Sequence, residues 1–338
     1  MPLIGEIAGL LGLDRTTVSR ALRGEPGIQR ETVDAVRDLA SELRSAPKTS
    51  GAWGRRSSAV GVVVPSVNRW FYTLVLSGID KVLAENDFDL VLYDLSQPAN
   101  VARLFDREHL VNRVDGLLII ATEFELAQWD VLIGSELPMI SVGPAIPELR
   151  RIGVDDFQVA TAVTERVIAY GHTRIGYLGG FDETALVDSS VNDRERAFRD
   201  TLAAADIPFH PEWNISGEYR MGKAKEATEV FLAQGDLPTA IVCASDEMAL
   251  GALYAVSAAG LTPGREISLI GIDGHEYGES FGLATAAQYP DEQGALAADA
   301  IVSELSGRPF RSTFVPARWN IIERASLGRP LDQANRAE

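Results

Sequence analysis

The sequence predicts two parts: a small all-α head at the start of the chain, and an α/β body with two lobes that are each built on a parallel sheet. In the head, Ala8, Gly12 and Val18 have the spacing of a helix-turn-helix. From Ala59 onward, short apolar runs alternate with amphipathic helices, which is typical of a parallel sheet covered on both faces. This pattern restarts after Arg150 and so predicts a second lobe.

Each position of the predicted helix-turn-helix has a physical role. Ala8 is small where two helices cross closely, Gly12 can take the positive φ of a tight turn, and Val18 buries the second helix against the first. We expect Asp14 to cap the second helix, because its carboxylate can accept hydrogen bonds from free backbone N–H groups. A third helix with an apolar stripe is expected after Gln29.

The outer face of the second helix carries basic and hydroxyl side chains. Arginine can bind guanine through two hydrogen bonds in the major groove, and threonine or serine can bind phosphate. An ordinary amphipathic helix pair is the alternative, but the spacing, the cap and the outward arginines together favour DNA binding. The residues expected to contact DNA from this helix are Arg15, Thr16, Thr17, Ser19 and Arg20.

Charge is distributed unevenly along the 338 residues. The net charge of −17 alone argues against a nucleic-acid partner, because affinity for DNA rests largely on neutralising phosphates. Residues 1–58, however, carry nine basic and seven acidic side chains, whereas the rest of the chain carries 22 and 41. We therefore expect duplex DNA to meet only the head, and two weakly basic heads to act together.

Composition narrows the class of protein further. A hydrophobic content of 46% with 23% charged residues predicts a soluble globular protein. There is no apolar run long enough to span a bilayer and no signal-peptide pattern in residues 1–6, so we expect a cytoplasmic protein without a membrane partner. Cys243 is the only cysteine. No Cys/His spacing or Gly-rich phosphate loop indicates a metal or a cofactor.

The predicted elements divide the chain into a head, a linker and a body, at residues 1–46, 47–58 and 59–338. Lobe 1 is expected to combine about 59–154 with 288–318, and lobe 2 about 155–287 with 319–330. The expected strands are Ala59–Val64, Leu90–Tyr93, Gly116–Ile120, Met139–Val142, Ile175–Leu178, Ala240–Ala244 and Ser268–Ile272. The expected helices are Phe71–Glu85, Val101–Val111, Phe157–Tyr170, Asp193–Ala204, Gly222–Ala233, Glu247–Ala259 and Glu292–Leu305.

Polar and aromatic side chains follow several of these strands. Small molecules bind beyond the carboxyl ends of parallel strands, so these positions form the expected ligand site. Flat aromatic faces and paired acceptors suit a polyol such as a sugar. The alternative for Trp70 is a core aromatic. The positions selected in this way are Arg69, Trp70, Phe71, Asp94, Ser96, Ser245, Asp246 and Asp273.

The segment Thr17-Val18-Ser19-Arg20-Ala21-Leu22 resembles the recognition helix of the lac repressor (LacI/GalR) family of bacterial transcription regulators. The body is similar to the periplasmic-binding-protein-like (type I) ligand domain of the same family. Several matches in sequence order are more specific than any one of them. The matching segments are Val62–Pro65, Val114–Ile119, Gly171–Ile175, Asp246–Gly251 and Ile267–Asp273.

The resemblance implies further ligand-site residues. The family places an arginine that reaches the ligand at Arg194, a ligand-binding aspartate at Asp273 and an aromatic residue that lines the site at Tyr219. Ser245 departs from the asparagine that is common at its position. A solvated helix charge is the alternative for Arg194.

The linker is basic and contains Gly, Ser and Pro. In the family, a short hinge helix at this place inserts a leucine into the minor groove, but this linker contains two glycines and no leucine. Trp53 can supply the apolar wedge, and Arg55 and Arg56 the minor-groove charge. A flexible tether is the alternative.

The resemblance implies a repressor that binds double-stranded operator DNA as a homodimer and takes a small sugar or related metabolite as effector. A sugar-binding transport receptor shares the two-lobe body, but it would need an export signal and no head. An enzyme is the third class, because Gly278-Glu279-Ser280-Phe281-Gly282 fits a nucleophile motif and His275 lies nearby. That motif requires a strand directly before it, which the pattern does not predict.

Overall fold

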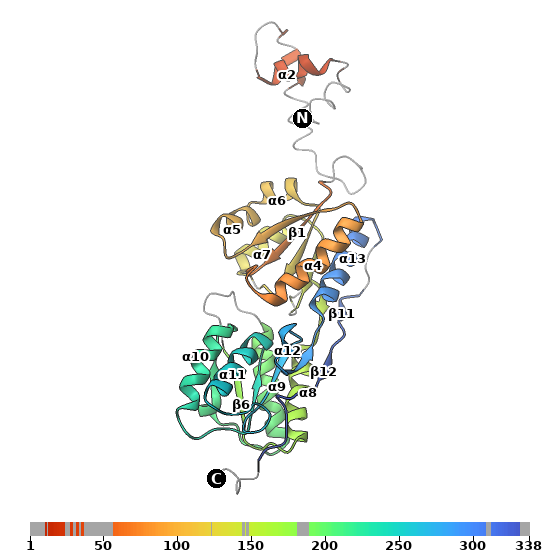
Figure 1. The fold of residues 1–338 in the computed structure, drawn as a ribbon. Helices are drawn as coiled ribbons and strands as arrows, with labels where there is room; N and C mark the ends of the chain where they lie inside the picture. The colour runs from red at the N-terminus through yellow and green to blue at the C-terminus, as the bar shows by residue number, and fades with distance from the viewer. Residues whose placement is uncertain are drawn as a thin grey trace. The chain divides into compact units, whose positions relative to one another are not determined.

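A computed structural model describes the fold of the chain (Figure 1). The chain divides into two compact units, residues 1–55 and 56–338. The residues that the structure describes are 11, 13–23, 28–29, 32–33, 35–36, 57–122, 124–143, 146, 149–180, 189–308 and 312–331.

Within the first unit, helix α2 spans Arg15–Arg23 and corresponds to the expected second helix of the helix-turn-helix. Asp14 caps this helix, as the sequence predicts. Its carboxylate accepts a 2.9 Å hydrogen bond from the backbone N–H of Thr17 and a 2.6 Å hydrogen bond from the Thr17 hydroxyl. These hydrogen bonds lower the pKa of Asp14, the hydroxyl bond contributing most, and so stabilise the charged form of the cap.

One face of α2 is buried and the other is open. Val18 and Ala21 are fully buried, whereas Thr16 is exposed. Val18 therefore has the inward position that the helix-turn-helix spacing requires. Ala8 and Gly12, the other two residues of that spacing, lie outside the described residues.

The first sheet of the body has six parallel strands in the described part of the chain, in the order β11-β5-β4-β3-β1-β2. Its interior strand β1 is buried along its whole length because every residue in it is apolar or glycine. The strands are β1 Ala59–Val64, β2 Asp89–Asp94, β3 Gly116–Ile120, β4 Met139–Val142, β5 Arg150–Gly153 and β11 Phe314–Pro316.

The second sheet also has six strands among the described residues, in the order β12-β10-β9-β8-β6-β7. All pairs are parallel except β12 with β10. The body therefore contains two α/β lobes, one on each sheet. The strands are β6 Ile175–Gly179, β7 Asn214–Ser216, β8 Ala240–Cys243, β9 Ser268–Asp273, β10 Ala284–Ala287 and β12 Asn320–Ile322.

The chain passes between the sheets after β5, after β10 and after β11. The second passage leads into α13, which lies beside α4 of the first lobe although the two helices are far apart in sequence (Figure 1). The helices of the body are α4 Trp70–Glu85, α5 Pro98–Leu104, α6 Arg107–Arg113, α7 Leu126–Ile133, α8 Asp156–Ala169, α9 Ser189–Ala204, the short 3₁₀ helix η1 Pro211–Trp213, α10 Met221–Leu232, α11 Asp246–Ala258, α12 Tyr277–Ser280 and α13 Pro290–Leu305.

All seven expected strands are present, with small differences at their ends. The sequence did not predict β5, β7, β10, β11 and β12, which are only three or four residues long. The expected helix at 101–111 is in fact two helices, α5 and α6. The second of these begins after Asp106, whose side chain accepts a hydrogen bond from the backbone N–H of His109. Helix α7 was also not predicted.

Helices α4 and α13 pack closely because each has a glycine at the contact. A Cβ added at Gly294 would overlap the carbonyl oxygen of Val75. A Cβ added at Gly78 would likewise overlap the carbonyl oxygen of Asp291. The two glycines thus let the backbones of α4 and α13 approach each other.

Replacing Gly294 by Ala is expected to lower the free energy of unfolding by about 1–3 kcal/mol, the usual cost of overpacking, because the two helices must move apart. Urea unfolding measures this change. Gly222→Ala in α10 is the matched control, since an added Cβ there meets nothing within 4 Å. Alanine is also the better helix former, so this variant should be at least as stable as the wild type. Equal effects of the two substitutions would contradict the close packing.

Candidate functional site

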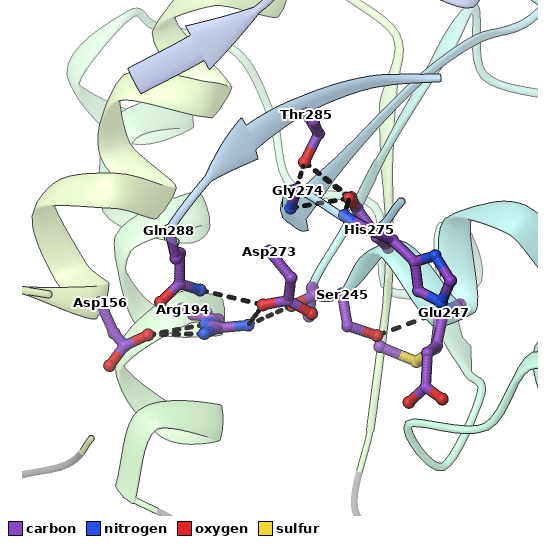
Figure 2. A network of polar contacts seen from close by, with 12 residues as sticks. Asp156, Arg194, Ser245, Glu247, Asp273, Gly274, His275, Thr285 and Gln288 are labelled. Atoms are coloured by element: carbon purple, nitrogen blue, oxygen red, sulfur yellow. Dashed lines mark hydrogen bonds and ion pairs between the residues drawn. The ribbon is translucent and has the colours of Figure 1, made fainter. Parts of the chain in front are cut away.

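A buried arginine joins three segments at the carboxyl end of the second sheet (Figure 2). The Nε of Arg194, on α9, donates a 2.8 Å hydrogen bond to Oδ1 of Asp156, and its Nη2 lies 2.8 Å from the same oxygen. Its Nη1 donates to the carbonyl oxygen of Ala244 and lies 3.7 Å from Oδ1 of Asp273. The guanidinium therefore links the start of α8 to the ends of β8 and β9. We call Arg194, Asp156 and Asp273 the Arg194 network.

The charges of the Arg194 network stabilise one another against burial. Burial alone would lower the pKa of Arg194, but the charges of Asp156 and Asp273 outweigh it, so the pKa lies above its usual value. Burial raises the pKa of Asp273 well above its usual value, although Arg194 acts in the opposite direction. A ligand that supplies hydrogen-bond donors to Asp273 would therefore reduce the cost of its charged form.

Asp273 is held in an uncommon backbone conformation. Its φ is 132°, in a region that L residues rarely adopt. The side chain of Gln288 donates a 2.9 Å hydrogen bond to Oδ1 of Asp273, and the backbone N–H of Gln288 donates a 3.0 Å hydrogen bond to its carbonyl oxygen. Strained residues persist where the surroundings fix them, often at binding sites.

Ser245 and Asp246 follow β8 and begin α11. The Ser245 hydroxyl accepts a 3.3 Å hydrogen bond from the backbone N–H of Met248 and so caps the helix. The Asp246 carboxylate is fully buried and accepts hydrogen bonds from the N–H groups of Gly274 and His275, at 2.9 and 2.7 Å. It also accepts from the hydroxyl of Thr285. All these partners belong to its own lobe, so Asp246 fixes the turn after Asp273.

Arg69 and Trp70 follow the end of β1 and contact residues that follow strands of the second sheet. Nη1 of Arg69 lies 3.5 Å from Oε2 of Glu247. The Trp70 ring stacks on the His275 ring, with centroids 4.4 Å apart and planes 21° from parallel. These contacts join the two lobes through the carboxyl ends of their sheets.

The remaining ligand-site predictions have different surroundings. Phe71 is partly buried against the core of the first lobe, and the Asp94 carboxylate accepts a 3.0 Å hydrogen bond from the backbone N–H of Ser96. Tyr219 packs against the core of the second lobe. Of these three residues, Tyr219 is the one that belongs to the same lobe as the Arg194 network.

The DNA-binding predictions are covered only in part. Thr16 is exposed on α2, and Arg20 is partly buried. The Thr17 hydroxyl donates to Asp14, which leaves its oxygen lone pairs for other partners. The side chains of Arg15 and Ser19, and the whole of Trp53, Arg55 and Arg56, lie outside the described residues.

Sequence reasoning did not select Asp156, Glu247 or Gln288. Asp156 follows β5, a strand that the sequence did not predict, and so it was not recognised as a strand-end residue. Gln288 was not recognised for the same reason, because it follows β10, another strand that the sequence did not predict. Glu247 directly follows Asp246, so its place near the end of a predicted strand could have been recognised. Its contact with the other lobe, however, depends on tertiary structure.

The structure offers no support for the nucleophile motif. Ser280 lies in α12, a helix of four residues, whereas β9 ends at Asp273. Within the described ranges, His, Cys, Asp and Glu side chains form no group that could hold a metal ion. Among the same residues, no helix is long and apolar enough to cross a membrane.

Known proteins resemble this chain in both sequence and fold. Residues 164–327 match the family model of a periplasmic binding protein-like domain. The chain is 28% identical to the HTH-type transcriptional repressor PurR of Photobacterium profundum, over 81% of this chain and 82% of the relative. It is 24% identical to the ribose operon repressor of Haemophilus influenzae, over 90% and 92%.

Two examples represent the solved structures that share the fold. One is the lac repressor dimer bound to operator and an anti-inducer, with a TM-score of 0.71, 22% identity, and coverage of 95% of this chain and 98% of that chain. The other is a LacI family regulator from Enterococcus faecium with bound ribose, with a TM-score of 0.69, 21% identity, and coverage of 81% and 100%.

The fold is that of a two-lobe, periplasmic-binding-protein-like domain, which follows a unit that contains helix α2. The sequence relatives are repressors that match this domain and, in the ribose repressor, nine tenths of the chain. The chain is a transcription regulator that is similar in sequence to repressors and shares its fold with the lac repressor (LacI) family. These relatives are transcription repressors and not enzymes.

Asp246→Asn is expected to remove a pH dependence of stability. Burial raises the pKa of Asp246 to about 6, above its usual value of 3.8. The folded state therefore binds the extra proton at Asp246, and the contribution of this carboxyl to stability is lost as pH rises from about 4 to about 6. Asparagine can still accept from Gly274 and His275 and can donate to Thr285.

The measurement is the free energy of unfolding from pH 4 to pH 8 for both proteins. The free energy of unfolding of the variant minus that of the wild type should rise by on the order of 2–3 kcal/mol between pH 4 and about pH 6. Above that pH the difference should stay constant. A difference that does not change with pH would show that the Asp246 carboxyl is not raised in pKa.

Proposed function

We propose that this regulator binds operator DNA through α2 as a homodimeric repressor in the cytoplasm, and that a small sugar or related metabolite controls this binding. The observation that carries the proposal is the Arg194 network, which places a buried guanidinium between two carboxylates at the carboxyl end of the second sheet. We further propose lobe 1 as residues 59–154 with 288–318, and lobe 2 as 155–287 with 319–330.

The chemistry of the Arg194 network suits a polyol. Asp273 and Asp156 offer acceptor oxygens for hydroxyl groups, and the Ser245 hydroxyl can donate while its oxygen accepts from Met248. Trp70 and Tyr219 add aromatic faces for the C–H surface of a sugar ring. The ribose in the Enterococcus faecium regulator supports this class of effector for a protein of the same fold.

The effector acts, in this proposal, by changing how the lobes sit against each other. The Arg69–Glu247 and Trp70–His275 contacts join the carboxyl ends of the two sheets, beside the turn that Asp273 begins. A ligand bound there has different contacts in the two arrangements of the lobes and so favours one of them. The first lobe then alters the spacing of the heads and the affinity for the operator.

Two heads related by a two-fold axis would read two inverted half-sites. Exposed apolar side chains on two adjacent helices of the second lobe support an interface between copies of the chain. Met221 on α10 and Tyr254 on α11 are exposed, and these two helices pack against each other through Gly251, where an added Cβ would overlap the Met221 carbonyl oxygen. The dimer of the lac repressor bound to operator, a protein of the same fold, supports this part of the proposal.

Arg20→Ala is expected to weaken operator binding by about 10- to 100-fold, because a lost arginine–guanine pair costs roughly 1–3 kcal/mol. Gel retardation with duplexes selected from a random library measures this, and sedimentation of the complex should show two chains per duplex. Arg265→Ala in the acidic body, where the side chain is exposed, removes the same charge and should change nothing. Equal binding by the wild type and the Arg20 variant would show that α2 does not read the bases.

Asp273→Asn is expected to abolish the thermal shift caused by the effector while leaving operator binding intact. A ligand at 100 times its Kd stabilises the folded state by about 2.7 kcal/mol, so loss of binding is readily measured. The probes are pentoses, hexoses and disaccharides, D-ribose included. Asp200→Asn, at an exposed site on α9, is the control. A wild-type response in the Asp273 variant would contradict the proposed site.

A further inference from the structure

Two buried tyrosines have hydroxyl groups without a hydrogen-bond partner among the residues that the structure describes. Tyr93, in β2, and Tyr177, in β6, are each only 2% exposed, and within the described part of the chain the buried hydroxyl of each has no partner. Buried tyrosine hydroxyls usually find a partner, and leaving one unpaired costs about 1–3 kcal/mol. Each of these hydroxyls therefore requires a physical explanation.

The two rings lean in opposite directions along their strands. The Tyr177 ring lies over Gly179, two residues further along β6, where an added Cβ would overlap Cε1 of the ring. The ring thus points toward the carboxyl end of the second sheet. The Tyr93 ring instead lies beside Gly61, which pairs with Val91 in the sheet register, so it leans back toward the amino end of the first sheet.

The Tyr177 ring leads to the Arg194 network. Its ring stacks on Phe198, with centroids 4.9 Å apart and planes 30° from parallel. Phe198 lies one turn after Arg194 on α9. Burial raises the pKa of the Tyr177 phenol well above its usual value, and the charge of Arg194 acts in the opposite direction. The ring of Tyr177 therefore points from the core of the second lobe toward the carboxyl end of its sheet, where the proposed effector site lies.

We propose that Tyr177 is a further effector-binding residue, whose hydroxyl donates a hydrogen bond to an oxygen of the effector. The proposal rests on the proposed function of the Arg194 network. The Arg194 donors are already directed at Asp156, Asp273 and the Ala244 carbonyl, whereas the Tyr177 hydroxyl is a donor with no acceptor among the described residues. An effector hydroxyl or ring oxygen placed there is selected over an analogue with hydrogen at that position.

Tyr177→Phe tests the hydroxyl, and Tyr93→Phe is the matched control. Both variants remove an unpaired hydroxyl and keep the ring, so both should fold at least as stably as the wild type. Calorimetric titration uses the sugar that stabilises the wild type most in a panel of pentoses, hexoses and disaccharides. Tyr177→Phe should raise Kd by about tenfold, the effect of one lost hydrogen bond, and Tyr93→Phe should leave it unchanged. An unchanged Kd for the Tyr177 variant overturns the proposal.

A second measurement needs no effector. Tyr177→Cys and Tyr93→Cys are treated with methyl methanethiosulfonate, and the native Cys243, which is buried, serves as a slow internal reference. If Tyr177 borders the ligand site, the thiol introduced by Tyr177→Cys should react at least tenfold faster than that from Tyr93→Cys. Equal rates overturn the proposal. If no sugar binds the wild type, the proposed effector class is wrong, and the thiol rates alone decide the placement of Tyr177.

Discussion

The ion pairs of Arg194 with two buried aspartates are the interaction on which the second lobe and its site depend. A guanidinium removed from water requires partners, and Asp156, Asp273 and the Ala244 carbonyl provide them from three separate segments. Removing one partner of such a buried pair typically costs about 3–5 kcal/mol, because a charge is left uncompensated. The same groups that hold α8, α9 and β9 together are therefore also the polar groups available to a ligand.

This network is joined to the part of the chain that passes between the lobes. Gln288 donates to Asp273, and its own carbonyl oxygen accepts a 2.8 Å hydrogen bond from the side chain of Gln293 on α13. Helix α13 packs on α4, which begins at Trp70. The Trp70 ring stacks on His275 of the second lobe. Asp273 is therefore connected both to the segment that passes between the sheets and to the contact between the lobes.

The central strands and the strand-end residues could be predicted because their signals are local. Continuous apolar runs such as β1 identify strands that are buried on both faces, and the rule for parallel sheets then selects Ser245 and Asp273. Short strands at or near the sheet edges give no such run: β5 is Arg-Arg-Ile-Gly, and β11 and β12 have three residues each. Asp156 and Gln288, which follow unpredicted strands, were missed for that reason.

The sequence by itself determined the α2 cap at Asp14, the alternation of strands and helices and the restart that makes two lobes, because capping and periodicity depend on neighbouring residues. Only the tertiary structure decided how similar side chains differ in role. Asp246 and Asp273 both follow a strand, yet Asp246 is bonded within its own turn, whereas Asp273 pairs with Arg194. Tyr93 and Tyr177 are equally buried, yet their rings lean toward opposite ends of their sheets. These differences depend on which distant residues surround each side chain, and only the packed fold brings those residues together.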